Sequence, residues 1–296
     1  MITPKAIHLL VPCTYKDEEE EKIRRDNFNA WFDDFTDKIK EKYDIVPNPF
    51  IAYTGSDLQG KEFELRFKGA TSKGLWIRCS LLTISTKYAY DEYGGVLLLF
   101  VDGSGKIPFK QLNDVLDALV QGYPIALGCR LNSNWTDDQS RLAAEGYENY
   151  LVEQKYGVKL PDAQCGCWGL NCHILKDLSL ISNSYEIELD LLINSLKNSY
   201  DICYIPITTE KGKSSYNEES NKRKLGYIAY KLDYTPKELM ALYDSYTKET
   251  GQKLPESYTE TIRETKNTIL KNKNQKIVCL KKQGEERCRE CNTASG

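Results

Sequence analysis

The chain has 296 residues, with 43 acidic and 40 basic side chains, a net charge of −3, and 41% hydrophobic residues. This balance excludes a disordered chain and allows either one large folded domain or a domain with an appendage. Because Lys and Arg are spread along the chain without a net positive charge, a nucleic-acid partner is not expected.

Short apolar segments alternate with longer amphipathic ones along the first two thirds of the chain. The strands predicted from them span residues 6–12, 50–53, 95–101, 124–128 and 202–207. The predicted helices span residues 23–43, 73–88, 109–121, 140–156 and 185–196. The glycine-rich segment 164–171 is expected to form no regular element. This order predicts an α/β fold with a mostly parallel central sheet covered by helices on both faces.

The composition changes towards the C-terminus. Residues 210–224 are polar and predict a mobile loop. The segment Thr235 to Glu238 is a capping box with proline at the first helical position, which predicts a helix to about residue 250. A second polar helix is expected over 257–273. We therefore divide the chain into a main domain, 1–210, and an extension, 211–296, made of a polar loop, helices and a cysteine-containing tail.

Four loops leave the carboxyl ends of predicted strands, at 13–15, 54–57, 102–105 and 129–130. In parallel sheets the carboxyl ends of the strands meet at one edge, and ligands bind there. The sequence therefore predicts a ligand site at this edge of the sheet.

The ten cysteines fall into two groups. Those in or beside apolar segments are expected to be free thiols of the core: Cys13, Cys79, Cys129, Cys165, Cys167, Cys172 and Cys203. The other three, Cys279, Cys288 and Cys291, have the C-x8-C-x2-C spacing of an incomplete zinc site in a Lys-rich tail. A zinc site and a loosely ordered tail both stay open for them.

Seven segments carry motifs in a fixed order. They are I-H-L-L-V-P-C-T-Y-K-D-E-E-E (7–20), Y-T-G-S-D (53–57), G-A-T-S-K-G-L-W-I-R (69–78), L-L-F-V-D-G-S-G-K-I-P (98–108), I-A-L-G-C-R (125–130), L-P-D-A-Q-C-G-C-W-G-L (160–170) and the segment 185–206. Together they resemble the GT-A glycosyltransferases of the family 2 type, especially the dolichol-phosphate-mannose synthase-like branch. The resemblance implies a GT-A fold and inverting transfer of a sugar from a nucleoside diphosphate to an acceptor that the sequence does not identify.

The resemblance also implies which residues bind the nucleotide sugar. They are Pro12, Thr14, Tyr15, Asp57, Lys73, Arg78, Asp102, Ser104, Arg130 and Arg141. Arginine and lysine suit the phosphate oxygens of a diphosphate. For Arg130 and Arg141, surface salt bridges are the alternative interpretation.

A divalent cation, Mg²⁺ or Mn²⁺, is the cofactor that the family's Asp-x-Asp motif implies, with Asp102 as its ligand here. Ser104 stands at the second acidic position of that motif, and Thr54 replaces another expected acid. A serine hydroxyl is a weaker ligand than a carboxylate. The open alternatives are an altered donor, a metal-independent transferase, and a catalytically inactive nucleotide-sugar-binding or scaffold protein.

Three carboxylates are candidates for the catalytic base that a hydroxyl acceptor requires: Asp162, then Glu186 and Glu188. A phosphate acceptor would need none. Because Glu186 and Glu188 are two residues apart on a predicted helix, one is expected to face the site and the other solvent. Gln164 and Trp168 are assigned to the acceptor side, where Trp168 either stacks on a sugar or anchors the packing.

Apolar runs in the sequence are short. The longest, Val96 to Val101, is far below the roughly 20 residues that a membrane-spanning helix needs. The first residues also lack the features of a signal peptide. We expect a cytoplasmic protein. Peripheral membrane contact stays open, because that branch of the family uses lipid phosphates; the oligomeric state does not follow from the sequence.

Overall fold

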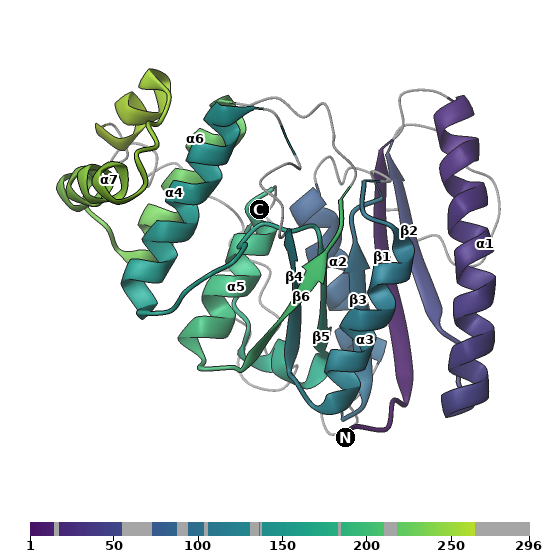
Figure 1. Ribbon diagram of the computed structural model, residues 1–296. Helices are drawn as coiled ribbons and strands as arrows, with labels where there is room; N and C mark the ends of the chain where they lie inside the picture. Colours follow the sequence, from purple (N-terminus) through teal and green to yellow (C-terminus); the bar gives the residue numbers. More distant parts are fainter. Residues whose placement is uncertain are drawn as a thin grey trace, which may run out of the picture.

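The computed structural model describes residues 1–14, 18–54, 73–87, 94–103, 106–130, 136, 138–182, 185–209 and 218–263. Within these ranges six strands form one sheet in the order β2-β1-β3-β5-β4-β6. Their bounds are β1 (Ala6–Thr14), β2 (Asn48–Thr54), β3 (Val96–Val101), β4 (Ile125–Arg130), β5 (Cys167–Asn171) and β6 (Ile202–Ile207). All neighbouring strands are parallel except β5, which is antiparallel to β3 and β4 (Figure 1). The predicted mostly parallel sheet is confirmed.

Helices cover both faces of the sheet, as predicted, because strand residues alternate between two hydrophobic cores. On one face, Leu97 and Leu99 pack with α1 (Glu18–Tyr43) and α3 (Leu112–Gln121). On the other face, Leu98 and Phe100 belong to the core formed by the remaining helices. These are α2 (Lys73–Lys87), α4 (Gln139–Tyr156), α5 (Ile187–Lys197), α6 (Glu218–Leu232) and α7 (Pro236–Thr250).

The expectation of no regular element over 164–171 was wrong, because Cys167–Asn171 forms the buried strand β5. Trp168 pairs with Phe100 of β3 on one side and with Leu127 of β4 on the other. Glycine is required at position 169 by close packing, since a Cβ there would lie 2.7 Å from Val115 Cγ1 of α3. Gly169, one of the glycines that argued against a strand, therefore serves helix-on-sheet contact.

The C-terminal helices pack against α4 and extend the same core (Figure 1). Helix α6 already begins at Glu218, so the predicted loop over 210–224 was too long. The predicted capping box opens α7: Thr235 Oγ1 accepts from Glu238 N at 3.2 Å, and the Glu238 carboxylate accepts from Thr235 N at 2.7 Å. Residues 256–263 form a further helical segment. The boundary at residue 210 stays a prediction, and Cys279, Cys288 and Cys291 lie outside the described residues.

None of the described helices combines the length and the apolar character that crossing a bilayer requires.

Candidate functional site

The carboxyl ends of β1 and β3 meet at one edge of the sheet. Gly103 N, just after β3, donates to Pro12 O of β1 at 2.9 Å, and Asp102 N donates to Gly166 O at 2.7 Å. A Cβ on Gly166 would lie 2.9 Å from Asp102 Cβ, so glycine permits this approach. Arg24 of α1 reaches the same edge, where its Nη1 donates to Gly103 O at 2.7 Å. The predicted convergence is therefore seen for the ends of β1 and β3, whereas residues 15, 55–57, 104 and 105 of the predicted loops lie outside the described residues.

Several residues expected to bind the donor are not placed. Tyr15, Asp57 and Ser104 lie outside the described residues, and for Thr14 only the backbone, at the end of β1, is described.

Lys73, the first residue of α2, joins two carboxylates at this edge. Its Nζ donates to Asp102 Oδ2 at 3.3 Å and forms an ion pair with Glu188 Oε1 of α5. Burial acts to lower the pKa of Lys73, but the Glu188 and Asp102 carboxylates outweigh it and raise that pKa. The Asp102 side chain is 37% exposed, against 12% for Lys73 and 8% for Glu188. We refer to Asp102, Lys73 and Glu188 as the ion triple. Asp102 is its most exposed member and is therefore the one that a ligand would contact.

The described residues do not fit a divalent metal ion in this arrangement. No cluster of three or more His, Cys, Asp or Glu side chains that could hold a metal occurs within them. Mg²⁺ and Mn²⁺ bind oxygen ligands, but the position between the Asp102 and Glu188 oxygens is taken by the Lys73 ammonium.

Arg130, the last residue of β4, forms a bidentate ion pair with Asp162 through the Nε and Nη2 edge of its guanidinium. Its Nε donates to Asp162 Oδ2 at 2.5 Å and its Nη2 to Asp162 Oδ1 at 2.8 Å, while Nη2 also donates to Glu145 Oε2 at 3.0 Å. Burial opposes the charge on Arg130, but Asp162 and Glu145 raise its pKa. This is the bidentate geometry of a strong ion pair.

Asp162 accepts four hydrogen bonds, from three nitrogens of Arg130 and from Gln164 N. Both carboxylate oxygens are therefore occupied by donors. The geometry favours a role in positioning Arg130 over the expected role of Asp162 as a free base.

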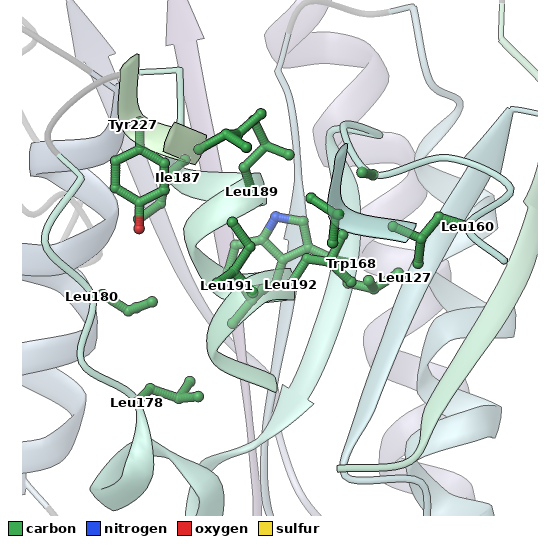
Figure 2. Close-up of a cluster of buried hydrophobic side chains, with 14 of the residues drawn as sticks. Leu127, Leu160, Trp168, Leu178, Leu180, Ile187, Leu189, Leu191, Leu192 and Tyr227 are labelled. Carbon is green, nitrogen blue, oxygen red and sulfur yellow. The ribbon is translucent and has the colours of Figure 1, made fainter. Parts of the chain in front are cut away.

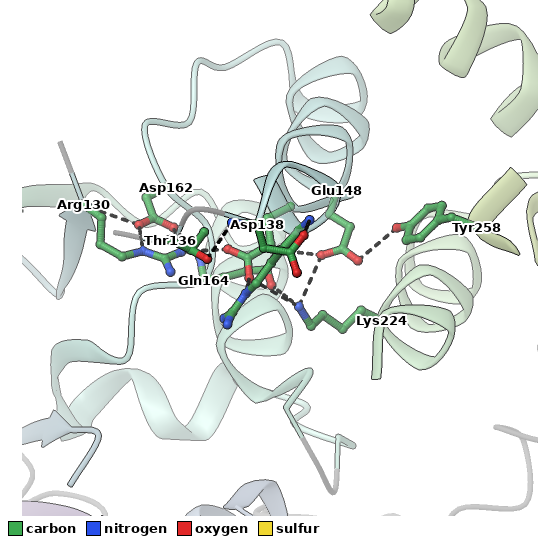
Figure 3. A network of polar contacts seen from close by, with 10 residues as sticks. Arg130, Thr136, Asp138, Glu148, Asp162, Gln164, Lys224 and Tyr258 are labelled. Atoms are coloured by element: carbon green, nitrogen blue, oxygen red, sulfur yellow. Dashed lines mark hydrogen bonds and ion pairs between the residues drawn. The ribbon is translucent and has the colours of Figure 1, made fainter. Parts of the chain in front are cut away.

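A buried polar network extends from Arg130 to the C-terminal helices (Figure 3). Glu145 also pairs with Arg141, whose Nε lies 2.9 Å from Glu145 Oε1. Lys224 Nζ of α6 donates to Gln164 Oε1 at 2.6 Å and lies 3.6 Å from Glu148 Oε2. The network thus joins the end of β4, helix α4 and helix α6.

Glu148 of α4 is fully buried and links the last members of this network. Its Oε2 accepts from Gln164 Nε2 at 2.5 Å, and its Oε1 accepts from the hydroxyl of Tyr258 at 2.9 Å. Sequence reasoning missed Glu148, Lys224 and Tyr258. The spacing of Arg141, Glu145 and Glu148 indicates one helix face, but nothing in the sequence points to their partners on α6 and 256–263.

Replacing Glu148 with glutamine is expected to change how stability depends on pH. Burial raises the pKa of Glu148 above its ordinary value of 4.5. The folded protein then keeps this proton where the unfolded chain has lost it, so the group's contribution to the free energy of unfolding falls as pH rises above 4.5. In urea unfolding, the stability of Glu148→Gln relative to wild type should therefore rise with pH through this window.

Glu145→Gln is the matched control on the same helix. Burial acts to raise the pKa of Glu145, but Lys224, Arg130 and Arg141 together lower it below 4.5. Its contribution is therefore present above pH 4.5 and lost as pH falls through the lowered pKa. The same sign of pH dependence in both variants would contradict this account of the network.

Two residues expected to contact ligands are instead part of the core. Arg78 is 1% exposed, and its Nη1 donates to Ile181 O at 3.0 Å, which ties α2 to the segment before α5. Trp168 is also 1% exposed and lies among buried apolar side chains (Figure 2). It stacks on Phe100 with ring centroids 4.6 Å apart. The expected donor contact of Arg78 and the expected sugar contact of Trp168 do not fit these positions, whereas the packing alternative for Trp168 does.

Glu186 and Glu188 are both buried at the start of α5, so the expectation that one of them faces solvent was wrong. Glu188 pairs with Lys73, and Glu186 Oε1 lies 3.7 Å from Arg223 Nε of α6. Burial raises the pKa of Glu186, partly offset by its own backbone N–H and by Arg223.

Six of the seven cysteines predicted in the core are free and lie in or near it, as predicted, whereas for Cys13 only the backbone is described. Cys129, Cys165, Cys167 and Cys172 are buried. Burial raises the pKa of the Cys167 thiol to about 12, so this thiol is protonated and unreactive at neutral pH.

No protein-family model matches the chain, and no curated protein matches it in sequence. Solved structures do match. Glucosyl-3-phosphoglycerate synthase from Mycobacterium tuberculosis has a TM-score of 0.52 and 12% identity, covering 77% of this chain and 81% of that one. Its complex with Mn²⁺, uridine diphosphate and phosphoglyceric acid has a TM-score of 0.52 and 12% identity, covering 77% and 78%. A further mycobacterial protein has 14% identity and a TM-score of 0.52, covering 77% and 75%.

At these identities the similarity shows the fold. The chain has the GT-A glycosyltransferase fold that the sequence motifs implied, with helices added at its C-terminus. The dolichol-phosphate-mannose synthase-like branch stays a prediction.

Proposed function

We propose that this chain transfers a sugar from a nucleoside diphosphate donor to an acceptor, with inversion at the anomeric carbon. The observation that carries the proposal is the position of Asp102, a partly exposed carboxylate directly after β3 at the carboxyl-end edge. The shared fold supports it, since a glycosyltransferase of that fold was crystallised with Mn²⁺, uridine diphosphate and phosphoglyceric acid. Ligands of open α/β sheets bind at this edge.

The proposed donor subsite lies along β1 and β3. Residues 12–15 and Asp57 bind the nucleoside, as the sequence resemblance implies. The diphosphate lies near the start of α2, beside Lys73, where the backbone N–H groups at the N-terminus of the helix can donate to phosphate oxygens. Arg130 helps to shape the acceptor side while Asp162 holds it in place.

Glu186 is the proposed base for a hydroxyl acceptor. Its described ion pair is a single long contact with Arg223, whereas Asp162 accepts four hydrogen bonds and Glu188 is paired with Lys73. A base with a raised pKa suits proton transfer near neutral pH. The acceptor hydroxyl would pass its proton to Glu186 while its oxygen attacks the anomeric carbon and the nucleoside diphosphate leaves.

A catalytically inactive nucleotide-sugar-binding or scaffold protein on the same fold is the second candidate. Two observations favour it: Asp102 is engaged by Lys73, and Ser104 and Thr54 replace acids that the family motif contains. This candidate shares the donor subsite but predicts no turnover.

Calorimetric titration with UDP-, GDP- and CDP-sugars, each in EDTA and in Mn²⁺, tests both candidates. We expect at least one sugar nucleotide to bind wild type and to be hydrolysed slowly. Glu186→Gln should keep that affinity but lose roughly 10²–10⁴-fold in turnover with a hydroxyl acceptor. Asp34→Asn, at an exposed ion pair on α1, is the control and should leave both unchanged.

The outcomes separate the candidates. Binding without hydrolysis or transfer would favour the inactive protein. Failure of every sugar nucleotide to bind would overturn both candidates.

A further inference from the structure

At the start of α2, the ammonium group of Lys73 pairs with two carboxylates that come from different elements. Lys73 Nζ is 3.3 Å from Asp102 Oδ2, after β3, and in ion-pair contact with Glu188 Oε1, in the first turn of α5. We propose that Lys73 is the resident cation of this site and excludes a divalent metal ion from the position between Asp102 and Glu188. The description of this site as a donor site rests on the proposed function. The proposal that Lys73 takes the place of a metal ion does not.

Two carboxylates that approach each other this closely require a positive charge between them, because otherwise they repel and one takes up a proton. A divalent ion would be an ordinary solution, since carboxylate oxygens are its preferred ligands. Here the chain supplies the positive charge from its own side chain. An incoming metal ion would therefore have to displace Lys73 and would meet its positive charge nearby.

The ammonium is held in place by more than its two ion pairs. Nζ lies 5.1 Å above the ring of Phe100, and that ring is stacked on the buried Trp168. A cation over an aromatic face gains further stabilisation where water is excluded, and the Lys73 side chain is only 12% exposed. Lys73 is thus anchored on the core, unlike a surface lysine that rotates freely.

The sequence supports a single positive charge, that of Lys73, at this edge of the sheet. Ser104 and Thr54 stand at two positions where the resembling family has acids, so fewer negative charges need compensation. One ammonium, together with the partial positive charge at the N-terminus of α2, comes close to balancing the two carboxylates that remain in place.

Titration of the full chain with Mn²⁺ alone, followed by calorimetry and by the electron paramagnetic resonance signal of free Mn²⁺, tests the proposal. Lys73→Met should bind Mn²⁺ at least about tenfold more tightly than wild type, because the competing charge is gone and both carboxylates remain. Adding Glu188→Gln to Lys73→Met should abolish that gain.

Lys231→Met is the matched control. Lys231 Nζ lies 3.3 Å from Asp190 of the same helix α5 and 5.7 Å from the ring centre of Tyr227, and its side chain is 16% exposed. It therefore resembles Lys73 in burial and ring contact, but among the described residues its ion pair is with one carboxylate and not with two. Its replacement should leave Mn²⁺ affinity at the wild-type value.

Thermal melting reports whether each variant folds. If Lys73→Met fails to melt cooperatively, Lys73→Gln, which is neutral and retains a donor for Glu188, carries the same expectation. Equal Mn²⁺ affinity in wild type and the neutral Lys73 variant would overturn the proposal. Tight Mn²⁺ binding by wild type that Asp102→Asn abolishes would also overturn it.

The sugar-nucleotide titrations fail or succeed separately. If no sugar nucleotide binds but neutral Lys73 variants gain Mn²⁺ affinity, the proposed transferase function is wrong and the proposed role of Lys73 is supported. If sugar nucleotides bind but the neutral Lys73 variants gain no Mn²⁺ affinity, the proposed role of Lys73 is wrong and the proposed nucleotide-sugar binding is supported.

Discussion

Replacing Arg130 with methionine is expected to lower the free energy of unfolding by about 3–5 kcal/mol, because it leaves the buried Asp162 carboxylate without its cation and removes one of the ion pairs of Glu145. The side chains of Arg130, Asp162 and Glu145 are 11%, 7% and 7% exposed. Water therefore cannot replace the lost guanidinium contacts. Urea unfolding at neutral pH, followed by circular dichroism, measures the loss.

Two further variants show whether burial is the cause. Lys38→Met removes an ion pair on α1 whose side chains are 63% and 61% exposed, and it should change stability by only about 0–1 kcal/mol. Combining Arg130→Met with Asp162→Leu should recover part of the loss, since one uncompensated charge is removed. If Arg130→Met costs no more than Lys38→Met, the pair is not structural and Arg130 is available to a ligand.

Replacing Trp168 with alanine is expected to cost about 3–5 kcal/mol through the cavity that it leaves. The indole is fully buried on β5, between β3 and β4, and stacks on Phe100 at 13° between ring planes. Trp168→Phe, which keeps an aromatic ring there, should cost markedly less. Urea unfolding measures both.

The control for Trp168 is Tyr185→Ala, because Tyr185 is 56% exposed. It should stay within about 0.5 kcal/mol of wild type. If Trp168→Ala unfolds like wild type but weakens sugar-nucleotide binding, Trp168 contacts the ligand and its assignment to the core is wrong.

Together these substitutions distinguish residues that stabilise the edge of the sheet from residues that bind a ligand there. Arg130, Asp162, Arg78 and Trp168 hold the scaffold through buried contacts. Asp102 is the more exposed member of the ion triple with Lys73 and Glu188. The sequence motifs mark both kinds of residue alike, because a motif does not distinguish a side chain that supports the site from one that binds in it.

Local patterns were sufficient for most of the elements. The apolar run Val96 to Val101 is buried on both faces of the sheet, and the capping box at Thr235 forms as predicted, because both depend on neighbours in the sequence. Strand β5 was missed because its Gly169 is there for contact with Val115 of α3, which lies 54 residues earlier in the chain. The start of α6 was missed because its polar residues pack into a buried network.

The motifs of the sequence were therefore enough to indicate the GT-A fold, a ligand edge at the carboxyl ends of the strands and Asp102 as an acid at that edge. They could not indicate that Lys73 bridges Asp102 to Glu188, that Asp162 is occupied by Arg130, or that Glu148 and Tyr258 meet. Secondary structure follows from residues a few positions apart, whereas ion pairing and burial depend on which distant segments the folded sheet and helices bring into contact.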